Sequence, residues 1–207
     1  TQVSTPSNDT TPSFVFTTNE AGTITTNITE GFSTSASAST GSNQTVTFNT
    51  LGDGTYANKT ITVTDAAGNS SSLTLTTFVI DTASPTAAIT YSSAAPYKNG
   101  ETVTITATFN GAVLDSPVPT IAIAGSGIAN VTSTNMTKVS TTVYTYSYAV
   151  PTGDGTGTVT VGTGTDAAGN VVTSTPTSGA TFTVDNTAPT LTAVTQVSTP
   201  SNDTTPS

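Results

Sequence analysis

The chain has 207 residues, a formal net charge of −9, and charged side chains at 7% of positions. Its three basic residues cannot neutralise a nucleic-acid backbone or hold the chain on anionic lipid, which argues against both kinds of partner. It contains neither Cys nor His, so disulfides, thiolate metal sites and the common nucleophile–base pairs of enzymes are excluded.

Short runs that alternate apolar residues with Thr or Ser follow one another along the chain. This period of two is typical of strands with one buried face, and Thr favours strands because its branched Cβ packs well on a pleated surface. Gly- and Asn-rich turns separate the runs, and no segment has a helical period. We therefore predict an all-β chain with strands at 13–18, 23–28, 45–51, 59–65, 73–81, 87–91, 102–109, 120–124, 142–150, 157–162 and 180–185.

The two ends of the chain are identical, since residues 1–13 and 195–207 both read TQVSTPSNDTTPS. This identity indicates a repeat of 194 residues followed by the start of the next copy. Repeat arrays consist of units that contact their neighbours. The chain has no initial Met, no signal peptide and no apolar run of about 20 residues that could span a bilayer. We therefore interpret it as an excerpt from a longer or processed polypeptide.

Each repeat contains two related modules that share three motifs in the same order. We predict modules at 1–84 and 85–188, close to the ~100 residues of an immunoglobulin-like sandwich, and assign 189–207 to the next copy. The motifs are a Gly-Asp-Gly turn, an Asp-Ala-Ala-Gly-Asn loop and a Pro-bearing linker, at Gly52–Tyr56, Asp65–Asn69 and Asp81–Pro85, and again at Gly153–Gly157, Asp166–Asn170 and Asp185–Pro189.

These motifs resemble those of the bacterial immunoglobulin-like repeats of giant surface adhesins and extracellular filaments, and the resemblance covers the whole chain. It implies two tandem immunoglobulin-like β-sandwiches in an elongated rod outside a bacterial or archaeal cell. Two departures stand out. Gly157 replaces Tyr56, so the second module lacks the tyrosine that we expect to anchor the turn through a backbone hydrogen bond. The linker Asp81–Pro85 departs from the usual form by carrying Ser84 directly before the proline.

We expect the first module to lack its opening strand. The second module opens at Pro85–Tyr91, directly after the linker proline, whereas the counterpart for the first module is PTLTAV at 189–194, in the next copy. The first module would then complete its edge with a segment outside this chain or leave the edge open. An open edge invites pairing with another chain. Neighbouring copies, within one chain or through strand exchange, are therefore the expected partners.

The resembled family often holds Ca²⁺ at module junctions, which makes the junction acids candidate metal ligands. We expect the Asp-Ala-Ala-Gly-Asn loop and the linker after it to lie at one end of a module, where an acid from the next module joins them. Convergent carboxylates and carbonyls are what Ca²⁺ requires. Alternatively, Asp65 and Asp166 cap their loops, and Asp53 and Asp154 make local Asx turns. The candidate metal ligands are Asp65, Asp81, Glu101, Asp166, Asp185 and Asp203.

We predict a structural protein and not an enzyme. Paired carboxylates could hydrolyse glycosides, but each prominent Asp has a copy at a turn of the other module, as scaffold residues should. The alternative functions are a glycan- or cell-binding surface module, for which Tyr91 and Tyr97 are the candidate aromatic pair, and a component of a surface-layer lattice.

Two further groups of residues have open interpretations. Tyr144, Tyr146 and Tyr148 alternate on one face of a strand, which favours packing or cross-strand contact over a binding stripe. Asn-x-Ser/Thr sequons permit N-glycosylation, but chance alone would yield about five in so Ser- and Thr-rich a chain. They occur at Asn8, Asn27, Asn43, Asn58, Asn69, Asn130, Asn135 and Asn202.

Overall fold

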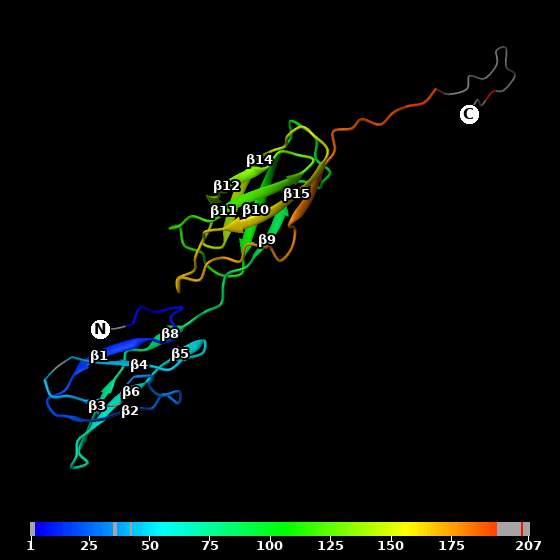
Figure 1. Ribbon diagram of the computed structural model, residues 1–207. Helices are drawn as coiled ribbons and strands as arrows, with labels where there is room; N and C mark the ends of the chain where they lie inside the picture. The colour runs from blue at the N-terminus through cyan, green and yellow to red at the C-terminus, as the bar shows by residue number, and fades with distance from the viewer. Residues whose placement is uncertain (1–2, 35–36, 42, 194–203, 205–207) are drawn as a thin grey trace.

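The structure is a computed structural model that describes residues 3–34, 37–41, 43–193 and 204. The described residues form strands and turns and contain no helix, which confirms the predicted all-β fold. Two modules follow one another end to end, and the segment after the second module runs away from it (Figure 1). Each module has its own cluster of buried apolar side chains, so each is built around a separate core.

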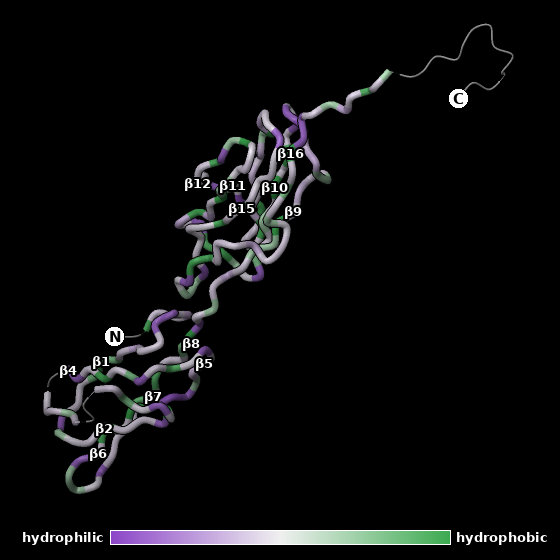
Figure 2. The backbone as a smooth tube through the Cα atoms, turned by 45° about the vertical axis from the view of Figure 1, so that its right-hand side comes forward, coloured by the Kyte–Doolittle hydropathy of each residue, from purple (hydrophilic) through white to green (hydrophobic). Residues whose placement is uncertain are grey.

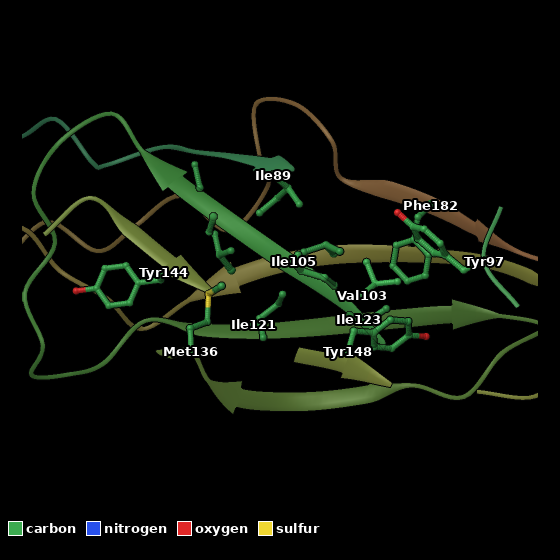
Figure 3. Packing of buried hydrophobic residues seen from close by; sticks show 14 of the residues in the cluster. Ile89, Tyr97, Val103, Ile105, Ile121, Ile123, Met136, Tyr144, Tyr148 and Phe182 are labelled. Atoms are coloured by element: carbon green, nitrogen blue, oxygen red, sulfur yellow. The ribbon is translucent and has the colours of Figure 1, made fainter. Parts of the chain in front are cut away.

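The second module is a sandwich of two 4-stranded antiparallel sheets, with the strand orders β13-β14-β10-β9 and β12-β11-β15-β16. Thr and apolar residues alternate along the predicted central strand, whose inward row Val103, Ile105, Ala107 and Phe109 is buried as expected. Figure 3 shows Val103 and Ile105 of this row beside Ile121 and Ile123 of the opposite sheet. The strands are β9 (Ala87–Tyr91), β10 (Thr102–Phe109), β11 (Thr120–Ser126), β12 (Val131–Asn135), β13 (Thr137–Lys138), β14 (Val143–Ala149), β15 (Gly155–Gly162) and β16 (Thr181–Val184).

The first module is a similar but more divided sandwich. Its described strands pair in the orders β1-β4, β3-β2-β6-β7 and β5-β8. Phenylalanines fill its core, where the rings of Phe14 and Phe78 have centroids 5.5 Å apart. Green, apolar stretches recur along the strands of both modules in Figure 2, as the alternation predicts. The strands are β1 (Ser13–Thr17), β2 (Gly22–Thr26), β3 (Ser37–Ala38), β4 (Asn43–Thr47), β5 (Gly54–Tyr56), β6 (Thr60–Thr64), β7 (Ser70–Thr74) and β8 (Phe78–Ile80).

One predicted strand, 73–81, is wrong as a single element. The chain instead forms β7, which pairs with β6, and β8, which pairs with β5 in another sheet. Between β5 and β6 lies Asn58, whose φ of 55° bends the chain, whereas β15 continues unbroken through the corresponding part of the second module. Side-chain alternation marks an extended segment but does not reveal where that segment changes its partner.

Both modules tie their opening segment to their closing strand in the same way. Ser7 donates its N–H to the carbonyl of Val79 and accepts from the N–H of Asp81, both at 3.0 Å. Tyr97 makes the same pair of bonds with Thr183 and Asp185, at 3.0 and 2.8 Å. The peptide bond before the preceding proline is cis in both segments. Ser7 and Tyr97 are therefore equivalent positions.

Candidate functional site

The junction between the modules is the candidate site, because motifs of both modules meet there. The loop Asp166–Asn170 of the second module contacts both the linker Asp81–Pro85 and the opening segment of the first module. The Asn170 side-chain amide donates to the main-chain carbonyl of Asp81 at 2.9 Å. The N–H of Asn8 donates to the carbonyl of Ala168 at 3.1 Å. Asn170 is only 7% exposed, so this polar contact is protected from water.

Asp166 holds its loop in the shape that presents Asn170 to the linker. One carboxylate oxygen of Asp166 accepts the N–H groups of Ala168 and Asn170, and the other accepts the Asn170 side-chain amide, all at 2.9 Å. Asp65 closes the equivalent loop of the first module with the same bonds, including one of 2.9 Å from the Asn69 side chain. The Asn69 side-chain amide is the main reason that the pKa of Asp65 lies below its usual range. The interpretation of both aspartates as loop caps is therefore supported.

The aspartates of the Gly-Asp-Gly turns bind the linkers, and the expectation of purely local Asx turns is wrong. Asp53 accepts the N–H of Thr82 at 3.0 Å and its hydroxyl at 2.8 Å. Asp154 accepts the N–H of Asn186 and the hydroxyl of Thr187, the latter at 2.7 Å. The Asn186 N–H, followed by the Thr187 hydroxyl, lowers the pKa of Asp154. These turns therefore fix the direction in which each linker leaves its module.

The expectation that the Asp-Ala-Ala-Gly-Asn loop and the following linker share one end of a module is wrong. β15 and β16 are antiparallel, with Gly155 opposite Val184, so Asp166 after β15 and Asp185 after β16 lie at opposite ends of the second module. The pairing of β5 with β8 likewise places Asp81 beside Asp53, away from Asp65. In the second module a single strand lies between the two motifs, so the chain passes from one end of the module to the other before it reaches the linker. Counting the strands between the motifs in the sequence could have predicted this separation.

The structure therefore regroups the six predicted metal ligands. Glu101 lies at the far end of the second module with Asp185, since its neighbour Asn99 donates to the Asn186 side chain at 2.6 Å. Asp65 lies at the outer end of the first module, where Glu20 lines the same pocket, and Asp203 falls outside the described residues. In the described part of the chain, no three acidic side chains gather as a metal-binding group. What the fold does bring together is Asp81 and Asp166, which line one cleft of about 330 Å³ between the modules.

The tyrosines belong to the framework of the modules. The Tyr56 hydroxyl donates to the carbonyl of Gly52 at 2.9 Å, which confirms the predicted anchor. Tyr144 and Tyr148 are buried and Tyr146 is half-buried against the core, which confirms packing as their role. Sequence reasoning missed the anchoring role of Tyr97, which is 2% exposed and donates to the carbonyl of Ser93 at 2.8 Å.

Tyr97 explains how the second module dispenses with a tyrosine at Gly157. In the first module the ring of Tyr56 stacks on Phe78, with centroids 5.0 Å apart. In the second module a side chain at Gly157 would overlap the ring of Phe182. Tyr97 packs on that same ring from the opening segment, as Figure 3 shows. The two ring centroids are 5.8 Å apart. The anchoring hydroxyl therefore lies on β5 in the first module and on the opening segment beside β16 in the second.

Comparison with known families decides the nature of the first module. Residues 4–82 match the bacterial Ig-like domain family. The first module is a bacterial Ig-like domain. No curated protein matches the chain. Within the described residues, no helix has the length and apolar character needed to cross a membrane.

Bacterial Ig-like domains are commonly extracellular or surface-exposed structural modules and typically carry no catalytic activity. The second Ig-like module repeats the linker and loop bonds of the first, with Asp154 in place of Asp53 and Asp166 in place of Asp65. Among the described residues, every aspartate of the shared motifs accepts hydrogen bonds from its own turn, loop or linker. The arrangement thus positions one module on the next.

Proposed function

We propose that the chain is a structural repeat unit of an adhesin stalk or filament outside a bacterial or archaeal cell, in which the Ig-like modules act as rigid spacers. The observation that carries this proposal is the junction contact from the buried Asn170 amide to the Asp81 carbonyl. A spacer keeps its two ends at a fixed distance only if the linkers between its modules resist bending. A linker hydrogen-bonded to the modules on both sides, by Asp53 and by Asn170, has this property.

The alternative function, a ligand-binding surface module, would need exposed aromatic side chains, and the candidate pair Tyr91 and Tyr97 does not provide them. Tyr97 is buried, and Tyr91 is half-buried with its hydroxyl donating to the carbonyl of Gly179 at 2.7 Å. Both rings pack on Phe182, with centroid distances of 5.8 and 5.6 Å. The pair therefore serves the core of the second module and supports the spacer function over glycan recognition.

Rotational diffusion tests the spacer function. Backbone ¹⁵N relaxation of a monomeric form of the chain should report one anisotropic tumbling for both modules, as expected of an elongated body. Two independent correlation times, each typical of a single module, would contradict the proposal. Antibodies against the chain should label intact cells that express the parent polypeptide. Labelling that requires permeabilised cells would contradict the extracellular location.

We also propose that Ca²⁺ binds at the junction cleft, with Asp81 and Asp166 as its carboxylate ligands. The chemistry of the two side chains fits a hard cation, because Ca²⁺ prefers carboxylate oxygens and Asp81 and Asp166 both line this cleft. A bound cation would neutralise two carboxylates contributed by different modules and so would stiffen the junction. By copy equivalence, Asp185 and the Asp65 of a following copy form the corresponding pair.

Thermal unfolding tests calcium binding. Ca²⁺ should raise the melting temperature relative to a chelator, because a ligand that binds only the folded state stabilises it. Asp166→Asn should abolish this difference. Asp65→Asn is the matched control when both variants are measured as monomers, since it changes the same loop at a position with no junction within one chain, and it should keep the calcium response. Equal melting temperatures with calcium and with chelator would remove calcium from the proposal.

A further inference from the structure

The opening strand of the second module, β9, lies between β10 and the segment 177–178 and is hydrogen-bonded to both. On one side it pairs with β10, where Ile89 lies opposite Ala107 and Ala87 lies opposite Phe109. On its other side, Ala87 accepts the N–H of Thr177 at 2.8 Å, and Ile89 donates to the carbonyl of Ser178 at 3.0 Å. The Ala87 and Ile89 side chains are buried. β9 is thus an inner part of the fold, held along both of its edges.

The counterpart of β9 for the first module is found at the other end of the chain. Pro96, just before Tyr97, follows Pro85 by eleven residues. Pro6, just before the equivalent Ser7, recurs in the repeated sequence as Pro200, which follows Pro189 by the same interval. Residues 189–193 therefore correspond to 85–89 position by position. Leu191 and Ala193 take the places of Ala87 and Ile89.

A groove of about 280 Å³ marks the place where the first module would receive this strand. Phe16–Asn19 form one wall of the groove and Ser71–Leu73, from the edge strand β7, form the other. The side chains of Ile61 and Val63 also line it. Leu73 is 51% exposed, a large value for a leucine that faces an apolar groove.

The groove corresponds to the seat of β9 in the second module. Residues 10–21 align without a gap to 101–112, which matches Asn19 to Asn110 and Phe16–Asn19 to 107–110. These are the residues beside which β9 lies, because Ile89 pairs with Ala107 and the Thr86 N–H donates to the Asn110 side chain at 2.8 Å.

The sizes of the side chains in the two pairings are complementary. In the second module a small residue of β9, Ala87, faces the large Phe109, and the large Ile89 faces the small Ala107. In the first module Thr18 replaces Phe109 and Phe16 replaces Ala107. The segment 189–193 has the large and small residues exchanged relative to β9: Leu191 would face Thr18, and Ala193 would face Phe16. Packed cores conserve the summed volume of facing side chains, so the segment and the groove fit each other.

We propose that the groove of the first module binds residues 189–193 of another copy as its opening strand, antiparallel to β1, with Ala193 opposite Phe16 and Leu191 opposite Thr18. The Thr190 N–H meets the Asn19 side chain, as Thr86 meets Asn110. In its own chain Leu191 is 97% exposed. The segment that contains it leaves the second module at the end remote from the first module (Figure 1). This inference rests on the structural role proposed above and names the contact through which copies associate.

Self-association of the 207-residue chain tests the proposal. Sedimentation velocity should show dimers and longer species that grow with concentration, because each chain offers one groove and one strand. Leu191→Asp should weaken association at least about tenfold, since a charge would enter the apolar groove. Thr192→Asp is the matched control: its counterpart Ala88 does not belong to the buried core, and it should associate like the unaltered chain. Association unaffected by Leu191→Asp, or absent from the unaltered chain up to millimolar concentration, would overturn the proposal.

Engineered cysteines test the register, because the natural chain has none. A Leu191→Cys chain mixed with a Thr18→Cys chain should form a disulfide-linked heterodimer under mild oxidation. Thr190→Cys mixed with Thr18→Cys should not, since its side chain points to the other face of the strand. Equal yields from the two mixtures would overturn the register. Failure of the spacer function would appear separately, as independent tumbling of the two modules within the monomeric Leu191→Asp variant.

Discussion

The side-chain amide of Asn170 and the main-chain carbonyl of Asp81 lie 2.9 Å apart, although they belong to different modules. The same Asn170 amide group binds the carboxylate of Asp166 in its own loop. One buried side chain therefore both closes a loop and holds that loop on the preceding linker. In the first module Asn69 closes the equivalent loop at the free outer end.

Asn170→Ala should loosen the junction, whereas Asn69→Ala should not. Both substitutions remove a bond to the loop aspartate, but only Asn170→Ala also leaves the Asp81 carbonyl without its donor. Loss of such bonds at a buried position costs about 1–3 kcal/mol. Distances between spin labels in the two modules should broaden only for Asn170→Ala. Equal distributions for the two variants would show that this amide does not position the modules.

Two neighbouring buried tyrosines should respond oppositely to removal of their hydroxyls. The Tyr144 hydroxyl donates to the Val113 carbonyl and to Asp115, at 3.1 and 2.9 Å. The buried Tyr148 hydroxyl has no hydrogen-bond partner among the described residues. Tyr144→Phe should therefore lower the free energy of unfolding by about 1–2 kcal/mol, and Tyr148→Phe should leave it unchanged or raise it. Urea unfolding measures both, and a larger loss for Tyr148→Phe would contradict this account.

The second module should lose stability at alkaline pH. Burial, and then the hydrogen bond with Asp115, raises the pKa of Tyr144 to about 12. Between the ordinary tyrosine pKa of about 10 and this value, the unfolded chain releases a proton that the folded chain keeps, so stability falls as pH rises. Below pH 10 the contribution is complete. Tyr144→Phe should flatten the decline, as followed by unfolding between pH 9 and 12. Burial also raises the pKa of Tyr91 to about 12, so part of the decline should remain.

Gly157→Ala should destabilise the second module by about 1–3 kcal/mol, because the added methyl group would overlap the Phe182 ring and displace it from Tyr97. Gly111→Ala is the matched control. No atom lies within 4 Å of a Cβ built there, and its φ lies outside the left-handed region. Thermal unfolding of both variants measures the difference. Equal stabilities would show that the space above Gly157 is not filled as described.

The strands and their buried faces follow from local pattern, which is why much of the fold could be predicted. Val103 and Ile105 alternate with Thr, and both are buried as the alternation predicts. The anchor of Tyr56 on Gly52 was predictable for the same reason, since it lies within four residues. The replacement of that anchor by Tyr97 could not be predicted, because Tyr97 and Phe182 are distant in sequence and meet only in the folded module.

The sequence by itself determined the period of 194 residues, the shared motifs and the all-β alternation, because each is a property of residue order or of local side-chain spacing. Only the tertiary structure decided which motifs meet. Antiparallel pairing of β15 with β16 sends Asp166 and Asp185 to opposite ends, so the loop of one module contacts the linker before it and not the linker after it. Likewise, the groove beside Phe16 becomes visible only once β1 and β7 are folded around it, because strand pairing joins residues distant in sequence.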